Sequence, residues 1–273
     1  LVPPDKQGPG ALLELKDTSG KTVKSLLLGA KHMQQSSGGP MGESSYPDGR
    51  YVMVDGKTES IALVADALTQ VEPKAEDWVN KDWFKVEKHK SISVVTTNAT
   101  NNWKLSRDTE AGEWKLANLS TNEQYDTSKG SSVTSALSWP SFNDVAVNKA
   151  PDVTGLDKPL VTATLENFEG FTYTAKVGQK VGSEDNYYFQ IAVAGNFPKE
   201  RTPGKDEKPE DKDKLDKEFK EQLKKKEEKL KTEQAFQKWT YIMSKWTIDP
   251  LLKERKDLLV EKKDEAKPEE PKK

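Results

Sequence analysis

The sequence contains no cysteine and only two histidines, and this scarcity excludes several classes of function. Without cysteine the chain has neither a disulfide framework nor a thiol nucleophile. His32 and His89 have no carboxylate spacing typical of a metal site, and neither lies in a Gly-x-Ser-x-Gly or comparable context. We therefore predict a protein that is not an enzyme, with no catalytic residue, no metal ligand and no cofactor.

Long apolar runs and an excess of one charge are also missing. No apolar run approaches the roughly 20 residues that a membrane helix needs. With 43 basic and 45 acidic residues the net charge is −2, so charge gives no reason to expect a nucleic-acid partner. The chain begins at Leu1 with Pro3 and Pro4 close behind, which favours a cut downstream of a signal or an anchor; a trimmed methionine or tag is the alternative.

A hairpin-like pattern is present twice, at 11–29 and at 161–178. An offset of 150 residues places Leu15 on Leu165 and Gly20 on Gly170. Apolar and polar residues alternate in the second copy, which is typical of half-buried strands. Both glycines suit a turn position that needs a positive φ. These features predict two related β-hairpins.

The segments after each hairpin also correspond, which favours a tandem repeat over a chance likeness between hairpins. Each copy continues with a tyrosine-containing strand, a further strand and a short helical stretch. In the first copy these are 51–56, 61–64 and 77–84, and in the second 187–195, 239–243 and 249–259.

Residues 85–160 form a spacer between the copies. A strand is expected at Ile92 to Val95, and a hairpin that pairs Trp103 and Leu105 with Trp114 and Leu116. Packing is the favoured role of these two tryptophans over carbohydrate stacking. A short helix capped by Asp126 or Thr127 should run through Leu137 and stop before Pro140, and extended structure should resume at Phe142.

Two segments interrupt the repeats. Residues 30–49 lack periodicity and predict a long surface loop, in which His32 is expected to be solvated. Residues 199–235 hold 13 Lys/Arg and 12 Asp/Glu. We expect a flexible link there, followed from Leu215 by a helix with a thin apolar stripe that lies lightly on the surface or projects.

The predicted fold is α+β, with two tandem strand-rich repeats of antiparallel hairpins and short helices, a β-hairpin and helix spacer, and a charged helical insertion. The predicted boundaries are a linker at 1–10, repeat 1 at 11–84, the spacer at 85–160, repeat 2 at 161–260 with its insertion at 199–235, and a disordered tail at 261–273.

Several stretches taken in order resemble the bacterial domain-of-unknown-function family numbered 4340. They are the segments 13–23, 77–84, 103–108 with 112–116, 155–159 and 238–252. The resemblance covers most of residues 11–260, and the charged insertion departs from the family's simpler pattern. It implies an extracytoplasmic accessory protein, facing the periplasm behind an N-terminal membrane helix, of a kind found near gliding-type ABC transport systems.

Our leading hypothesis is a non-enzymatic envelope protein that binds a protein partner, such as a transporter or surface assembly, through 30–49 or 199–235. The alternative is a glycan- or peptide-binding module that uses a groove between the repeats. It would use those tryptophans that are exposed among Trp78, Trp83, Trp139, Trp239 and Trp246. The burial of the indoles distinguishes the two, and the sequence assigns no partner-binding residue.

Overall fold

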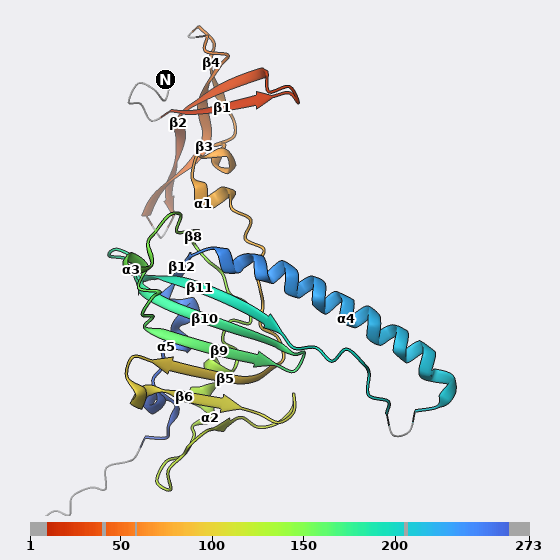
Figure 1. The fold of residues 1–273 in the computed structure, drawn as a ribbon. Coiled ribbons are helices and arrows are strands. Elements are labelled where there is room, and N and C mark those ends of the chain that lie inside the picture. The colour runs from red at the N-terminus through yellow and green to blue at the C-terminus, as the bar shows by residue number, and fades with distance from the viewer. Residues whose placement is uncertain (1–9, 40–41, 58, 205–206, 262–273) are drawn as a thin grey trace, which may run out of the picture. The chain divides into compact units, whose positions relative to one another are not determined.

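The computed structural model describes residues 10–39, 42–57, 59–204 and 207–261. It confirms the α+β class: the strands form two antiparallel sheets, one of four strands and one of eight (Figure 1). The chain divides into two compact units, 1–79 and 80–273, and each holds one sheet. No helix among the described residues is long and apolar enough to cross a bilayer. Of the predicted linker and tail, only Gly10 and Glu261 lie within the described residues.

The first unit is a four-stranded meander in which each strand pairs with the next. Its strands are β1 (Ala11–Lys16), β2 (Thr22–Gly39), β3 (Gly42–Val54) and β4 (Ile61–Val64), followed by η1 (Thr69–Val71) and α1 (Ala75–Trp78). Arg50 is buried; its Nε donates to the Gly29 carbonyl at 2.9 Å and its guanidinium pairs with Glu72 at 2.9 Å. This ion pair fastens the segment after β4 to the central strands.

The prediction of an irregular loop at 30–49 is wrong, because β2 and β3 continue through most of it as a paired ribbon. The pairing includes His32 with Gly49 and Gln34 with Tyr46, and the register shifts at several points. Met33, Gln34 and Gln35 are all exposed, so neither face of this ribbon has the apolar alternation from which a strand is normally recognised.

The second unit is built on the eight-stranded sheet, in the order β7-β6-β5-β9-β10-β11-β12-β8. Its strands are β5 (His89–Thr96), β6 (Trp103–Ser106), β7 (Lys115–Leu116), β8 (Asp144–Val145), β9 (Val161–Asn167), β10 (Phe171–Lys180), β11 (Asn186–Gly195) and β12 (Tyr241–Ser244). The alternation predicted for β9 and β10 is confirmed, since every second residue is buried. The spacer hairpin is confirmed in part: Leu105 lies opposite Leu116, but β7 begins at Lys115, so Trp114 does not pair with Trp103 and lies under Arg107 instead.

Helices surround this sheet. They are α2 (Thr127–Thr134), α3 (Pro151–Thr154), α4 (Lys212–Gln234) and α5 (Lys245–Leu252), with 3-10 turns η2 (Ala99–Asn101), η3 (Pro209–Asp211), η4 (Ala235–Lys238) and η5 (Arg255–Leu258). Asp126 caps α2 as predicted, because its carboxylate accepts the backbone N–H groups of Ser128 and Lys129. The charged insertion forms α4, whose first half extends beyond the sheet (Figure 1).

Aromatic side chains fill the core of the second unit. Phe84, Phe171, Tyr173 and Phe189 are all at most 1% exposed. The indole of Trp83 meets several of its neighbours edge to face, including Phe84 at 4.5 Å and Phe142 at 5.0 Å between centroids. Such pairs stabilise a core beyond the area they bury.

Both units contain a four-strand antiparallel meander in chain order followed by a short helix. In the first unit this is β1 to β4 with α1, and in the second β9 to β12 with α5, where α4 is inserted between β11 and β12. The turns of the two first hairpins hold Gly20 at φ 84° and Gly170 at φ 94°, which confirms the predicted positive φ at both glycines.

Candidate functional site

A cavity of about 810 Å³ in the second unit is the candidate functional site. It is lined by the end of α2 and the loop that follows, by the turn between β10 and β11, and by the end of β12 with α5. We call it the Trp139–Trp246 groove. Its lining residues are Ser132, 135–140, Asp185, 244–247, Asp249 and Pro250.

The loop after α2 supplies the floor of the groove and one of its tryptophans. Ala136 and Leu137 are buried, and Leu137 adopts a left-handed φ of 57°. The Ala136 carbonyl lies 2.8 Å from the buried His89 Nε2, and the Leu137 carbonyl accepts the Val86 N–H at 3.0 Å. A non-glycine residue at positive φ is maintained only where its surroundings fix the backbone, as these two bonds do.

This anchored loop presents Trp139 to solvent. The indole is 75% exposed, and the Lys85 ammonium lies 4.0 Å from the centre of its ring. A cation over an aromatic face is attracted by the ring quadrupole, so Lys85 favours one orientation of the indole. The lysine occupies one face of the ring, and the opposite face is available for a ligand.

Helix α5 supplies the second tryptophan. Ile248 and Leu251, three residues apart, are fully buried and fasten the helix to the unit. Trp246 and Asp249, also three residues apart, are exposed, and Trp246 is 86% exposed. The helix therefore shows one face to the core and presents an indole and a carboxylate at the groove.

The start of α5 is tied to the turn between β10 and β11. The Lys245 backbone N–H donates to the Asp185 carbonyl at 2.6 Å, and the Ser244 and Thr247 hydroxyls lie 3.1 Å apart. The Asp185 side chain pairs with Lys180 at 2.7 Å. A hydrogen bond from Lys180 lowers the pKa of Asp185, so this carboxylate is ionised at neutral pH.

Several polar groups at the groove have no hydrogen-bond or ion-pair partner within the described parts of the chain. They are the Asp249 carboxylate, the Ser138 hydroxyl and the indole N–H groups of Trp139 and Trp246. The carboxylate accepts hydrogen bonds, the hydroxyl both donates and accepts, and the two indole N–H groups donate. The groove can therefore offer a ligand both flat apolar faces and hydrogen bonds.

The other three tryptophans of the predicted set are not among the lining residues of the groove. Trp78, in the first unit, is 62% exposed and donates to the Glu72 carbonyl at 2.8 Å. Trp239 is 50% exposed, and Trp83 belongs to the aromatic core. Trp103, favoured for packing, is buried and donates to the Lys253 carbonyl at 2.7 Å.

The histidines do not form a site. His32 Nδ1 lies 2.6 Å from a carboxylate oxygen of Asp48 in the first unit, whereas His89 is buried in the second. Among the described residues no group of three or more His, Asp or Glu side chains could hold a metal ion.

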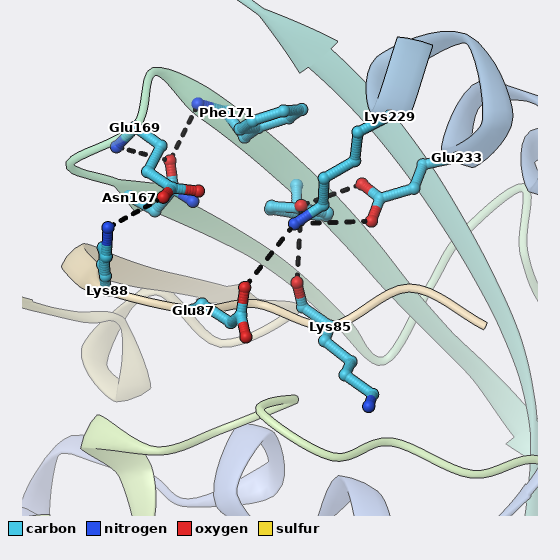
Figure 2. A network of polar contacts seen from close by, with 9 residues as sticks. Lys85, Glu87, Lys88, Asn167, Glu169, Phe171, Lys229 and Glu233 are labelled. Atoms are coloured by element: carbon cyan, nitrogen blue, oxygen red, sulfur yellow. Dashed lines mark hydrogen bonds and ion pairs between the residues drawn. The ribbon is translucent and has the colours of Figure 1, made fainter. Parts of the chain in front are cut away.

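A polar network that no local sequence pattern predicts anchors α4 to the sheet. Figure 2 shows Lys229 between Glu87 and Glu233, at 3.8 and 3.9 Å. Glu233 is buried and accepts the Tyr173 hydroxyl at 2.8 Å. Burial raises the pKa of the Glu233 carboxyl. The hydrogen bond from Tyr173 and the positive charge of Lys229 act in the opposite direction and lower it. Since Glu233 and Tyr173 are buried where α4 meets the sheet, we assign the network to holding the helix.

The comparisons with known proteins give a family for part of the chain. Residues 40–159 match the model of the family described as "Domain of unknown function (DUF4340)". The chain contains a DUF4340 domain. The predicted resemblance is thereby confirmed over 40–159, a shorter part of the chain than the predicted 11–260. The matched segment includes α2 and Trp139 and ends before α5 and Trp246. No curated protein and no solved structure matched the chain.

Proposed function

We propose that this protein is a non-enzymatic, extracytoplasmic binding module and that the Trp139–Trp246 groove is its ligand site. One observation carries the proposal: the two most exposed tryptophans of the second unit line the same cavity. Concave sites with aromatic walls and a few convergent polar groups are the usual form of ligand pockets. An extended glycan or peptide with flat apolar faces suits this arrangement.

An accessory role in a membrane assembly is the second candidate. It is supported by the DUF4340 domain, whose resemblance implies an N-terminal anchor and a transport context, and by the projecting half of α4. In this role α4 or the ribbon at 30–49 would contact a transporter or a surface assembly. Fractionation of the full-length protein tests the anchor: recovery in the soluble fraction alone would contradict it.

We further propose that the two meanders arose by duplication. The shared strand order, the short helix that ends each meander and the positive φ of Gly20 and Gly170 support this origin. The insertion of α4 into one copy accounts for the difference in length.

Photo-crosslinking in the native host tests the ligand site. A photoreactive residue placed at Ser138 or at Asp249, both at the groove, should give adducts that mass spectrometry detects. The same residue at Trp239, which is half exposed and outside the groove lining, serves as the matched control. Adducts at the two groove positions and not at 239 support the proposal. Equal adducts at all three positions, or no adduct at 138 and 249, would contradict the proposal that the groove binds a ligand.

A further inference from the structure

We infer that the ligand of the Trp139–Trp246 groove is a neutral glycan whose pyranose rings stack on the two indoles. The inference rests on the proposed function, since it names the class of ligand that the same groove takes. It is carried by the exposed aromatic faces, the hydrogen-bonding groups of the lining and the balance of charge around them.

The indoles match the apolar faces of a sugar. A pyranose ring presents a face of C–H groups whose slightly positive hydrogens are attracted to the negative face of an aromatic ring. Trp246 is 86% exposed, and Trp139 is 75% exposed with Lys85 over one face. Each indole therefore has a ring face against which a sugar can lie, and two such platforms suit an oligosaccharide.

The polar groups of the groove match the hydroxyls of a sugar. Each sugar hydroxyl both donates and accepts, so its site needs acceptors and donors together. Asp249 can accept, Ser138 can do both, and the indole N–H groups can donate. A carboxylate that accepts from neighbouring hydroxyls forms charge-assisted hydrogen bonds, which are stronger than neutral ones.

The backbone around the groove disfavours a peptide that binds as an added strand. β12 is the strand that ends at the groove, and β11 and β8 are hydrogen-bonded to its two sides. β8 pairs with Tyr241 and Ile242 only, so β12 leaves at most two residues open on that side. This is too short an edge for strand addition, which is the main-chain route by which sheets capture extended peptides. A proline-rich peptide, which needs no free edge, is the competitor that the experiment includes.

The Asp249 carboxylate disfavours an acidic group in its part of the groove. Asp185, Asp249 and Lys245 are the charged residues of the lining, while Lys85 lies over Trp139 and Lys253 donates to the Ser132 hydroxyl at 3.0 Å. Lys180 pairs with Asp185 from outside the lining, so Asp249 remains uncompensated by an ion pair. A uronate or a phosphate would lie close to this carboxylate. Two like charges brought together in an interface weaken binding, so such a ligand is disfavoured.

Calorimetric titration tests the inference, with five probes: chitotetraose, cellotetraose, maltotetraose, an acidic tetragalacturonate and a decaproline peptide. An array of neutral glycans extends the neutral set. We expect saturable binding of at least one neutral glycan and none of tetragalacturonate. Trp139→Ala and Trp246→Ala should each weaken binding by about tenfold or more, since aromatic anchors dominate such sites. Trp239→Ala, outside the groove lining, should leave it unchanged.

The Asp249→Asn variant tests the groove independently of the tryptophan variants, in case one of those folds poorly. Asp249→Asn keeps the shape of an exposed side chain and removes its charge, so it should weaken the neutral glycan several-fold and relieve the exclusion of tetragalacturonate. Far-UV circular dichroism of each variant confirms folding.

The outcomes separate this inference from the proposal on which it rests. Binding of decaproline alone, with loss in the tryptophan variants, overturns the glycan and leaves the groove as the ligand site. Absence of binding to every neutral glycan also overturns the inference, and adducts at Ser138 in the host would then still support a ligand of another class. Glycan binding that survives both tryptophan variants contradicts the groove itself.

Discussion

Two groups of aromatic side chains in the second unit differ in almost every physical respect. The Trp83 ring is surrounded by four others, at centroid distances of 4.5 to 5.9 Å: Phe84, Phe142, Phe189 and Tyr241. At the groove, Trp139 and Trp246 have no aromatic neighbour within the described chain and face solvent. Phe84, Phe189 and Tyr241 are at most 3% exposed. Burial of one such ring contributes roughly 1.5–3 kcal/mol, a contribution that the exposed pair largely forgoes.

Aromatic side chains therefore stabilise the fold in one place and are available for binding in the other. Three sets of variants test buried residues of the second unit, in order of decreasing expected effect. A final experiment tests the exposed Trp139 and Trp246.

The largest effect is expected from Phe189→Ala. Phe189 is fully buried and lies 5.9 Å from Trp83, so its truncation leaves a cavity in the aromatic core. We expect the free energy of unfolding to fall by about 3–5 kcal/mol, measured by urea denaturation. A loss below about 1 kcal/mol would show that these rings do not form a closely packed core.

A smaller effect is expected where the sheet anchors α4. Tyr173→Phe removes the hydroxyl that donates to the buried Glu233 at 2.8 Å, which leaves that carboxylate short of a partner. The free energy of unfolding should fall by about 1–3 kcal/mol, and hydrogen exchange in the C-terminal half of α4 should rise.

Tyr188→Phe is the matched control for the anchor. Tyr188 is buried, and its hydroxyl has no hydrogen-bond partner in the described part of the chain. Its loss should change the unfolding free energy by less than about 0.5 kcal/mol. Equal losses in the two variants would contradict the assignment of Tyr173 as an anchor.

The pH dependence of stability tests the support beneath the groove. Burial lowers the pKa of His89 below its ordinary value of 6.5, partly offset by its bond to Ala136. Below pH 6.5 the unfolded chain therefore binds a proton that the folded chain does not, and the free energy of unfolding falls as the pH falls. For one group the slope is at most about 1.4 kcal/mol per pH unit.

His89→Gln isolates this contribution, because the glutamine amide can donate to the Ala136 carbonyl and does not titrate. Denaturation at pH 5.5, 6.5 and 7.5 should show a loss of stability at low pH in the wild type that is smaller in the variant. Glu233, whose pKa burial raises, contributes with the opposite sign in both proteins, since its stabilisation is lost as the pH rises. Identical pH profiles would contradict a neutral, buried His89.

Much of the fold could be predicted from local patterns. The alternation in β9 and β10 is visible because one face is buried, and Asp126 is a recognisable N-cap. The ribbon at 30–49 could not be predicted, since residues 33–35 and 45–47 are all exposed and no apolar alternation marks a buried face. In the sequence, Glu233 is one of many acidic residues in a Lys/Glu run. It is distinguished only by its hydrogen bond from Tyr173, a residue distant in the sequence.

The candidate site could be predicted only in part. Sequence reasoning places Trp139 and Trp246 among five candidate tryptophans for a ligand, but nothing local brings these two together. Their proximity depends on the sheet order, on the bond of Lys245 to Asp185 and on the left-handed Leu137. Such tertiary features have no periodic signal in the sequence.

The most direct test of the central claim measures folding and adduct formation on the same proteins. The photoreactive residue is placed at Ser138 in the wild type, in a Trp139→Ala, Trp246→Ala double variant and in a Trp239→Ala control. We predict that all three proteins unfold within about 0.5 kcal/mol of one another and that the adduct at 138 is lost only in the double variant. A double variant that is less stable by more than about 2 kcal/mol, or that keeps the adduct, would contradict the account.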